Sequence, residues 1–425
     1  MKAITHLRGF RAKNFKAIQD SKMVTFTPLT VLIGNNGSGK SSLIEAMETY
    51  RSIVVDGLDK AMERWFGFEH ILNKGTRRRT RFSDASEMLR HPMYFGWSGR
   101  FPVNSGTGEM LITARSGFSS ILIEKEVIRQ KDKLVTRRAD GQCVTDWFGK
   151  AVHQIDTFET GRSVLSRGAR DMVAGWQFLS LSPDPMGRPT PTKLAVDGRL
   201  MLNRDGSNIA QYLLEIRKKD PSAFEVIVEK MQFILDYAKN FEPVESQEIH
   251  RTMYLQMREE GFEIPGWLIS TGTIRALALL AVLNNPDPPR LLVIEEIEDG
   301  LDPRTLNLLV AEIRNAIEDG RTQVIATTHS PYLLDLLDLS HLIFVERVDG
   351  APVFRRPDSQ AIVRQWAATF APGQLYTMGK INSQKAAAIT IPEVKPGQLV
   401  TVPPMPEVKP RQLVTMGKIH GQGRE

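Results

Sequence analysis

The chain has 425 residues, 41% of them hydrophobic, which is enough for a large core spread over two to three domains. Lysine and arginine number 55 against 49 aspartates and glutamates, and this mildly basic balance permits nucleic acid as a partner without requiring it. The single cysteine, Cys143, excludes a disulfide framework and a multi-cysteine metal cluster. No apolar stretch reaches the roughly 18 residues of a membrane helix and the N-terminus lacks a signal-peptide core, so we expect a cytoplasmic protein without a membrane partner.

The first segment, residues 1–65, begins with predicted strands. The last of them, Leu29–Ile33, is apolar throughout, and it leads through a glycine-rich loop into a helix that starts near Ser41. Residues 66–204 are predicted to be a mixed α/β insertion. This insertion contains the basic cluster Arg77-Arg78-Arg79 with Arg81, which is either a contact for nucleic-acid phosphates or a solvated surface.

Residues 205–264 are predicted to form a helical lobe. Ser207 can cap one helix, and Asp220 followed by Pro221 starts a second one. Apolar residues in the second helix recur at steps of three and four, which indicates one buried face. No heptad pattern continues for long, so extended coiled-coil arms are not expected.

Helices and apolar strands alternate again over 265–380. We predict helices over 272–284 and 303–318, and strands at 290–294, 322–327 and 342–345. This pattern is typical of a parallel sheet that is buried on both faces. In the last segment, 381–425, the sequence Pro-Glu-Val-Lys-Pro begins at 392 and again at 406, and such proline-rich repeats favour a disordered tail over a partner-binding one.

The loop after Leu29–Ile33 matches the phosphate-binding pattern G-x-x-x-x-G-K-[ST] at every defined position. Its glycines let backbone N–H groups face a phosphate, and the following helix adds positive potential. Lys40 would contact the β- and γ-phosphates of ATP, and Ser41 would bind Mg²⁺. The predicted nucleotide-binding residues are Gly34, Asn35, Asn36, Gly37, Ser38, Gly39, Lys40, Ser41 and Ser42.

Polar residues end two further strands. Glu295 and Glu296 follow Leu291–Ile294, an arrangement that directs one acid toward Mg²⁺ and the other toward an attacking water. Acidic strand ends also occur for solubility alone, and the phosphate loop is what favours the catalytic interpretation. His329 follows a third strand. A lone histidine is often structural, but ligands of open α/β sheets bind at this edge.

In chain order, the phosphate loop, Ser270-Thr271-Gly272-Thr273, the acidic strand, Gly300-Leu301-Asp302-Pro303 and Thr328-His329-Ser330-Pro331 resemble an ABC-type ATPase head of the SMC/RecF class. More narrowly, residues 1–380 resemble the stand-alone bacterial "AAA family" ATPases related to the overcoming-lysogenisation-defect proteins. The resemblance implies a P-loop NTPase fold: an ABC/SMC-like head built from 1–65 and 265–380, with a mixed β-sheet lobe and a helical insertion between the phosphate loop and the signature motif.

The resemblance also implies a role for each motif. Ser270, Gly272 and Thr273 would form the signature motif, which binds ATP held by a second subunit. Taken by itself, this segment favours an ordinary helix cap, and the resemblance reverses that preference. Gly300, Leu301 and Asp302 would form a loop at the dimer interface. Glu295 would be the Mg²⁺-side acid and Glu296 the catalytic base. With Lys40 and the switch histidine His329, Glu296 completes the predicted catalytic set.

The expected function is therefore an ATP-binding and hydrolysing switch that works as a homodimer or higher homo-oligomer. We expect a role in DNA maintenance or anti-phage defence, with DNA and a separate protein effector as partners. The separate effector is expected because no acidic cluster for a metal nuclease follows His329. The alternative is a nucleotide-gated scaffold that sequesters or activates an effector with little hydrolysis. A transporter subunit fits poorly, because the signature departs from Leu-Ser-Gly-Gly-Gln.

Overall fold

The structure is a computed structural model, and it describes residues 7–75, 91–100, 105–115, 118, 120–131, 133–148, 153–159, 161–165, 167–192, 200–246 and 252–381. The basic cluster Arg77 to Arg81 and the repeats of the predicted tail lie outside the described residues. Among the residues that the structure does describe, no helix combines the length and the apolar character needed to span a bilayer.

A six-stranded sheet forms the centre of the fold. Its order is β11 (Trp176–Leu179), β16 (Leu291–Ile294), β17 (Gln323–Thr328), β4 (Leu29–Ile33), β18 (Leu342–Val348) and β19 (Ala351–Arg355). The first five strands are parallel and β19 is antiparallel to β18. The parallel sheet predicted over 265–380 is confirmed. Because parallel strands end at the same edge, the residues that follow β4, β16 and β17 come together there.

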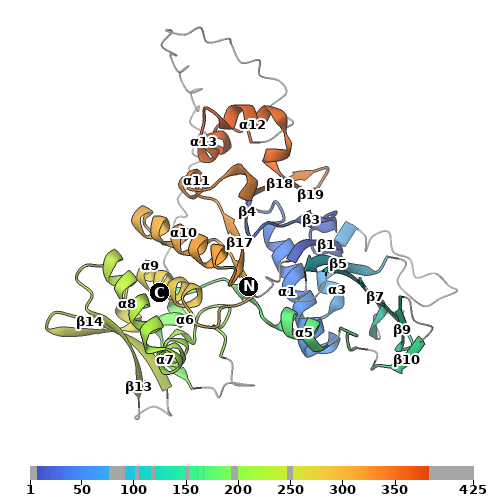
Figure 1. Cartoon of the computed structure of the whole chain (residues 1–425), viewed down its shortest axis with the longest axis horizontal. Coiled ribbons are helices and arrows are strands. Elements are labelled where there is room, and N and C mark those ends of the chain that lie inside the picture. The colour runs from blue at the N-terminus through green and yellow to red at the C-terminus, as the bar shows by residue number, and fades with distance from the viewer. Residues whose placement is uncertain are drawn as a thin grey trace, which may run out of the picture. The chain divides into compact units, whose positions relative to one another are not determined.

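The core sheet is covered on both faces by helices. On one face lie α9 (Thr271–Leu283) and α10 (Pro303–Glu318), and on the other lies α1 (Lys40–Asp56) (Figure 1). Alternate strand residues enter two separate hydrophobic cores: Val31 and Ile294 pack with α9 and α10, whereas Leu32 and Val293 pack with α1. This alternation explains why these strands are apolar at every position.

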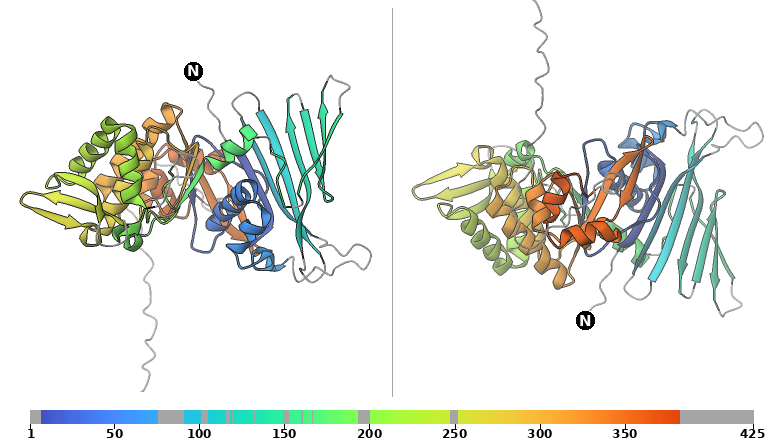
Figure 2. Two further views of the ribbon diagram at one scale, coloured as in Figure 1. Left: turned by 90° about the horizontal axis from the view of Figure 1, so that it is seen from below. Right: turned by 90° about the horizontal axis from the view of Figure 1, so that it is seen from above.

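A nine-stranded antiparallel sheet packs on α1 and shares its core (Figure 2). Buried aromatic side chains fill this contact, where the Trp97 indole donates a hydrogen bond of 2.6 Å to the Tyr50 hydroxyl. Strands from the predicted insertion thus extend the N-terminal sheet. The strands are β1 (Leu7–Phe15), β2 (Ile18–Asp20), β3 (Val24–Thr25), β5 (Met93–Arg100), β6 (Ser105–Ala114), β7 (Ile121–Gln130), β8 (Lys133–Arg138), β9 (Gln142–Trp147) and β10 (His153–Thr157).

The segment predicted as a helical lobe is helical only in its first part. It contains α7 (Ile209–Lys219) and α8 (Pro221–Ile234), and α8 is capped by Asp220 as predicted. The cap of α7 is Asn208 and not Ser207. After α8 the chain forms an antiparallel sheet, because residues 253–258 alternate between buried and less buried side chains with a period of two. Its strands are β12 (Thr190–Pro191), β13 (Asn240–Ser246), β14 (Thr252–Glu259) and β15 (Phe262–Pro265).

Short elements complete the described chain. They are the helices α2 (Leu58–Glu63), α3 (Phe68–Ile71), α5 (Arg167–Ala174), α6 (Pro183–Gly187), α11 (Pro331–Asp335), α12 (Ala361–Ala367) and α13 (Pro372–Thr377), together with the 3₁₀ turns Gly266–Leu268, Leu339–His341 and Pro357–Ser359.

Candidate nucleotide-binding site

The phosphate loop joins β4 to α1, and its glycines are required by geometry. A Cβ atom on Gly34 would lie 2.0 Å from the carbonyl oxygen of Val345. Gly39 caps α1 with a φ of 114°, and a Cβ there would lie 2.5 Å from Pro352 Cγ. The loop therefore packs closely against β18 and β19 and leads directly into the start of α1, the usual location of a phosphate-binding loop.

Lys40 is buried inside this loop. Its Nζ donates hydrogen bonds to the carbonyl oxygens of Gly34 (2.6 Å) and Asn35 (3.2 Å). Burial lowers the pKa of Lys40, and the carboxylates of Glu296 and Glu298 oppose that shift. The hydroxyl of Ser38 is also buried and has no hydrogen-bond partner in the described residues. A buried cation and an unpaired hydroxyl in one loop fit the oxygen atoms of a phosphate.

Ser41 and Glu295 come together at the start of α1. The Ser41 hydroxyl is near enough to the Glu295 carboxylate to lower the pKa of that group, and the carboxylate also forms an ion pair with Arg204. Burial raises the pKa of Glu295, while Arg204 and Ser41 oppose that shift. A hydroxyl and a carboxylate in contact are oxygen donors of the kind that Mg²⁺ takes in nucleotide sites, so the two predicted metal ligands fit the ion.

Glu296 has an unusual backbone conformation, with a φ of 48°. Its N–H donates to Thr327 Oγ1 at 2.8 Å, and its carbonyl oxygen accepts from Arg275 Nη2 at 2.9 Å. A left-handed conformation is costly for a residue with a side chain and persists where the surroundings impose it. The neighbouring strand β17 and helix α9 therefore fix the direction in which Glu296 leaves the sheet.

His329 lies at the end of β17, as predicted. Its backbone N–H donates to Glu298 Oε1 at 2.6 Å. Burial and the charge of Lys40 lower the pKa of His329, whereas Glu298 and Glu296 act in the opposite direction. The imidazole is therefore neutral at neutral pH and able to donate one hydrogen bond.

One cavity of about 280 Å³ joins these groups. It brings together the phosphate loop, the catalytic carboxylate predicted after β16, and the histidine predicted after β17. The lining residues are Ala17, Asn36, Gly37, Ser38, Gly39, Lys40, Ser41, Ser42, Glu296, Thr327, His329 and Arg347.

The predicted signature residues do not line that cavity in the same chain. Ser270 Oγ accepts from the Thr273 N–H at 3.2 Å and lies 2.6 Å from Thr273 Oγ1, so Ser270 caps α9. Gly272 packs on the predicted interface loop, because a Cβ there would lie 2.1 Å from the Gly300 carbonyl oxygen. Asp302 caps α10 through the N–H groups of Arg304 and Thr305.

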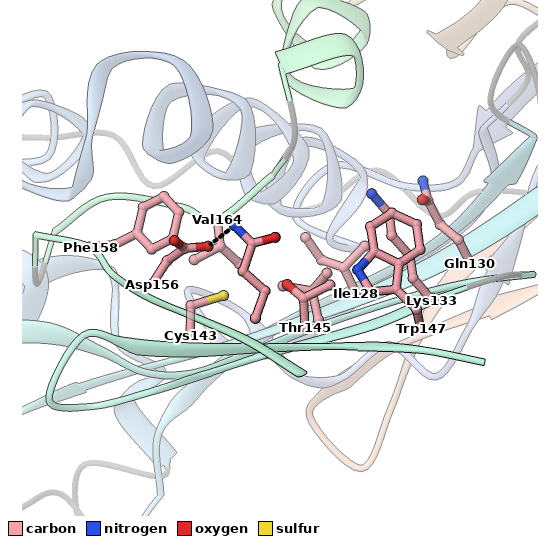
Figure 3. Close-up of a pocket in the computed structure, with 11 residues that line it drawn as sticks. Ile128, Gln130, Lys133, Cys143, Thr145, Trp147, Asp156, Phe158 and Val164 are labelled. Atoms are coloured by element: carbon pink, nitrogen blue, oxygen red, sulfur yellow. Dashed lines mark hydrogen bonds between the residues drawn. The ribbon is translucent and has the colours of Figure 1, made fainter. Parts of the chain in front are cut away.

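A second cavity lies on strands β7 to β10 of the nine-stranded sheet and shares no lining residue with the first (Figure 3). It is lined by apolar and polar side chains, including Trp147, Asp156 and Cys143. Burial raises the pKa of the Cys143 thiol. That thiol is therefore held in its unreactive, protonated form at neutral pH.

Several residues of the site were not predicted from the sequence. Arg204 contacts Glu295, Glu298 contacts His329, and Thr327 holds the Glu296 N–H. Thr327 is the residue before the last one of β17, the strand beside the acidic strand, and a polar residue at that position is a signal that could have identified it. Arg204 precedes Asp205-Gly206. That pair was interpreted only as a turn, and no role was assigned to the arginine beside it.

Two family models match the sequence. Residues 188–335 match the family described as "AAA domain, putative AbiEii toxin, Type IV TA system", and residues 7–52 match the family described as "AAA ATPase domain". The second match contains the phosphate loop, and the first contains the signature, the acidic strand and His329. The resemblance to AAA-family ATPases is thereby confirmed.

The chain is also similar to solved SMC head structures. It is 14% identical to an SMC head bound to the C-winged helix domain of ScpA (TM-score 0.45, covering 82% of this chain and 97% of that chain). Identity to the SMC head domain of Thermotoga maritima is 15% (TM-score 0.38, 83% and 98%). Identity to the Pyrococcus furiosus head with an extended coiled coil, bound to the C-terminal domain of ScpA, is 13% (TM-score 0.47, 86% and 100%). A search of curated proteins gave no match.

The sheet order, with the phosphate loop after β4 and the acidic strand two positions away, defines a P-loop NTPase. The predicted fold class is confirmed.

Proposed function

We propose that this chain is an ABC/SMC-like ATPase that binds ATP with Mg²⁺, hydrolyses it, and works as a homodimeric switch. The observation that supports this most strongly is the single cavity that joins Lys40, Glu296 and His329 from the ends of three adjacent strands. Groups for binding phosphate, orienting water and sensing the γ-phosphate are thus within one site.

The phosphate loop would hold the triphosphate. Lys40 would exchange its bonds to the loop carbonyls for bonds to phosphate oxygens, and the free hydroxyl of Ser38 would gain a partner. Ser41 and Glu295 would hold Mg²⁺, which neutralises phosphate charge when it is bound. The start of α1 adds its positive potential at the same point.

Glu296 would orient the attacking water. Its fixed backbone limits the positions of the carboxylate, and such positioning is the main contribution that a protein makes to phosphoryl transfer. The neutral imidazole of His329 would donate a hydrogen bond toward the γ-phosphate. Burial and the charge of Lys40 keep the imidazole neutral, so it would act as a donor without a counter-ion.

The signature residues would act on the nucleotide of a second copy. Ser270 caps a helix of 13 residues and its N-terminus does not line the phosphate cavity of its own chain, which supports a contact in trans. Gly300 lies against that helix end, and the loop Gly300 to Asp302 would cross the same interface. Two ATP molecules would then join two chains head to tail, and hydrolysis would release them.

The output of such a switch would pass to a separate effector, in DNA maintenance or anti-phage defence. In the alternative function, a nucleotide-gated scaffold, ATP binding alone would hold or release the effector. The scaffold is favoured by the threonines of the signature, because the Thr273 hydroxyl is already engaged by Ser270 and leaves fewer groups for a trans nucleotide.

The test is ATP binding and hydrolysis by the purified protein, with and without double-stranded DNA, beside Lys40→Ala and Glu296→Gln. The ATPase proposal expects turnover in the wild type, loss of both binding and turnover in Lys40→Ala, and loss of turnover alone in Glu296→Gln. Stimulation by DNA would support the DNA-linked role. Tight ATP binding without turnover in the wild type would contradict the ATPase and support the scaffold.

A further inference from the structure

Arg275 is a buried arginine that joins three segments around the candidate site. It lies in α9, little more than one turn after Ser270, and only 4% of its surface is exposed. Nη1 donates to the carbonyl oxygen of Leu181 at 2.7 Å, and Nη2 donates to that of Glu296 at 2.9 Å. Nη1 also lies 3.0 Å from Asp299 Oδ2.

These contacts are a poor arrangement for stability alone. The carboxylate of Asp299 is 61% exposed, so solvent screens the ion pair. The Nε atom of Arg275 is buried and has no hydrogen-bond partner among the described residues. Burying a charge with one donor unsatisfied costs free energy that an apolar side chain of similar size would avoid. The guanidinium instead fixes the positions of two backbone carbonyl groups, those of Leu181 and Glu296.

One of those two carbonyl groups belongs to Glu296, the residue proposed to orient the attacking water. Glu296 has a φ of 48°, and two bonds hold it there: Thr327 Oγ1 binds its N–H and Arg275 Nη2 binds its carbonyl oxygen. Without Arg275, one side of this strained peptide is free to rotate toward a relaxed conformation. The Glu296 carboxylate would then lose its fixed direction.

Helix α9, which carries Arg275, is held rigidly. The N-terminus of α9 is seated on the interface loop, where Gly272 leaves no room for a Cβ beside the Gly300 carbonyl. The helix itself is buried from Thr273 to Leu283. Arg275 therefore extends from a fixed helix to the strained residue.

We propose that Arg275 is a positioning residue for the catalytic base, holding Glu296 in its left-handed conformation from the signature helix of the same chain. This inference rests on the proposed ATPase function. It assigns to Arg275 a role through Glu296 and no contact with the nucleotide.

The test compares Arg275→Ala and Arg275→Lys with Arg51→Ala. Arg51 is a matched control because it is a largely buried arginine that donates to a backbone carbonyl, that of Ala174, outside the cavity. For each variant we would measure ATP affinity, melting temperature, and turnover divided by the amount of protein that binds ATP. Ethylguanidinium would then be added to each alanine variant to refill the space of the lost guanidinium.

We expect kcat per binding-competent chain to fall about 10²-fold in Arg275→Ala, as misplacement of a reacting group by about 1 Å produces. ATP affinity should stay the same, ethylguanidinium should restore part of kcat, and Arg275→Lys should also be slow because an amine cannot span both carbonyls. Arg51→Ala should lose stability and keep kcat. An Arg275→Ala kcat equal to wild type, or a loss shared with Arg51→Ala, overturns the inference. No hydrolysis by the wild type instead contradicts the proposed function, and the inference falls with it.

Discussion

The guanidinium of Arg204 forms an ion pair with the carboxylate of Glu295, the first residue after the acidic strand. Arg204 also lies near Glu48 of α1, with its Nε 3.6 Å from Glu48 Oε2. Arg204 thus contacts two carboxylates: that of Glu295, itself a predicted Mg²⁺ ligand, and that of Glu48, which also pairs with Arg64. This arrangement ties the loop before α7 to both the phosphate-loop helix and the acidic strand.

Replacing Arg204 should destabilise the fold because Glu295 and Glu48 both lose a cation. In Arg204→Met, Glu295 and Glu48 lose a shared cation, and we expect a loss of about 2 kcal/mol in the free energy of unfolding at pH 8, below the full cost of a buried pair because Arg204 is partly exposed. The pKa of Glu295 is already raised by burial and would rise further, so the loss should shrink as pH falls and the carboxylate takes a proton.

Urea unfolding of the wild type and Arg204→Met at pH 5 and pH 8 measures this effect. Added Mg²⁺ should recover more stability in the variant than in the wild type. Equal destabilisation at both pH values would show that lost packing, and not charge, causes the change.

Glu126 gives the nine-stranded sheet a pH-dependent stability. Its buried carboxylate accepts hydrogen bonds from the Ser163 hydroxyl (2.6 Å) and the Val164 N–H (2.8 Å), and burial raises its pKa to about 7. The folded state therefore holds a proton that the unfolded chain, with a pKa of 4.5, has released. Between these two values, stability should fall by about 3 kcal/mol as pH rises.

Glu126→Gln should remove this contribution. We expect the difference between wild type and variant, measured by urea unfolding, to change by about that amount from pH 4.5 to pH 7.5. Parallel stability curves for the two proteins would show that Glu126 does not titrate in this range.

Gly272→Ala should separate nucleotide binding from hydrolysis. The added Cβ would meet the Gly300 carbonyl oxygen at 2.1 Å, and because that oxygen belongs to the backbone, the start of α9 or the predicted interface loop must move. The phosphate loop is distant in the chain and keeps its own contacts, so ATP affinity should be retained while turnover falls at least about 10-fold.

Gly261→Ala is the control for that substitution, because a Cβ there meets nothing within 4 Å. It should cost stability through its positive φ of 89° and leave turnover unchanged. Loss of ATP affinity in Gly272→Ala would contradict this separation of roles.

His329 should shape the pH dependence of hydrolysis. Burial and the charge of Lys40 lower its pKa from the ordinary 6.5, so the imidazole stays neutral to more acidic pH than a free histidine. We expect kcat to stay constant to a pH below 6.5 and to fall at more acidic pH, where the imidazole takes a proton. In His329→Gln, kcat should fall about 10²-fold and lose the acidic limb. A wild-type limb above pH 7 would contradict a neutral histidine in the active form.

The sequence was most informative where strands end. Polar residues after Ile33, Ile294 and Thr328 had to meet once those strands were parallel neighbours, because the phosphate loop and the acids mark one edge. The order of the strands could be inferred from the sequence only for these three strands. Buried strands of a parallel sheet are apolar at every position, so no alternation of polar and apolar residues indicates which strands are neighbours.

Other features depend on contacts that local patterns do not encode. Arg204 and Arg275 are ordinary arginines in the sequence, and their roles arise from carboxylates and carbonyls brought near by tertiary packing. The strands β13 to β15 were not predicted, because the apolar pattern of the helix α8 before them favoured a helical interpretation of the whole segment 205–264. The period of two in 253–258 was the signal for a strand.

The most direct test of the account is complementation between two defective chains. Lys40→Ala removes the phosphate contact and keeps the signature, whereas Ser270→Arg blocks the signature and keeps the phosphate loop. Each chain alone should be inactive. A one-to-one mixture should recover up to about a quarter of wild-type turnover, since half of randomly formed dimers contain one intact composite site. A mixture no more active than its parents, or full activity of Ser270→Arg alone, would contradict a site shared between two chains.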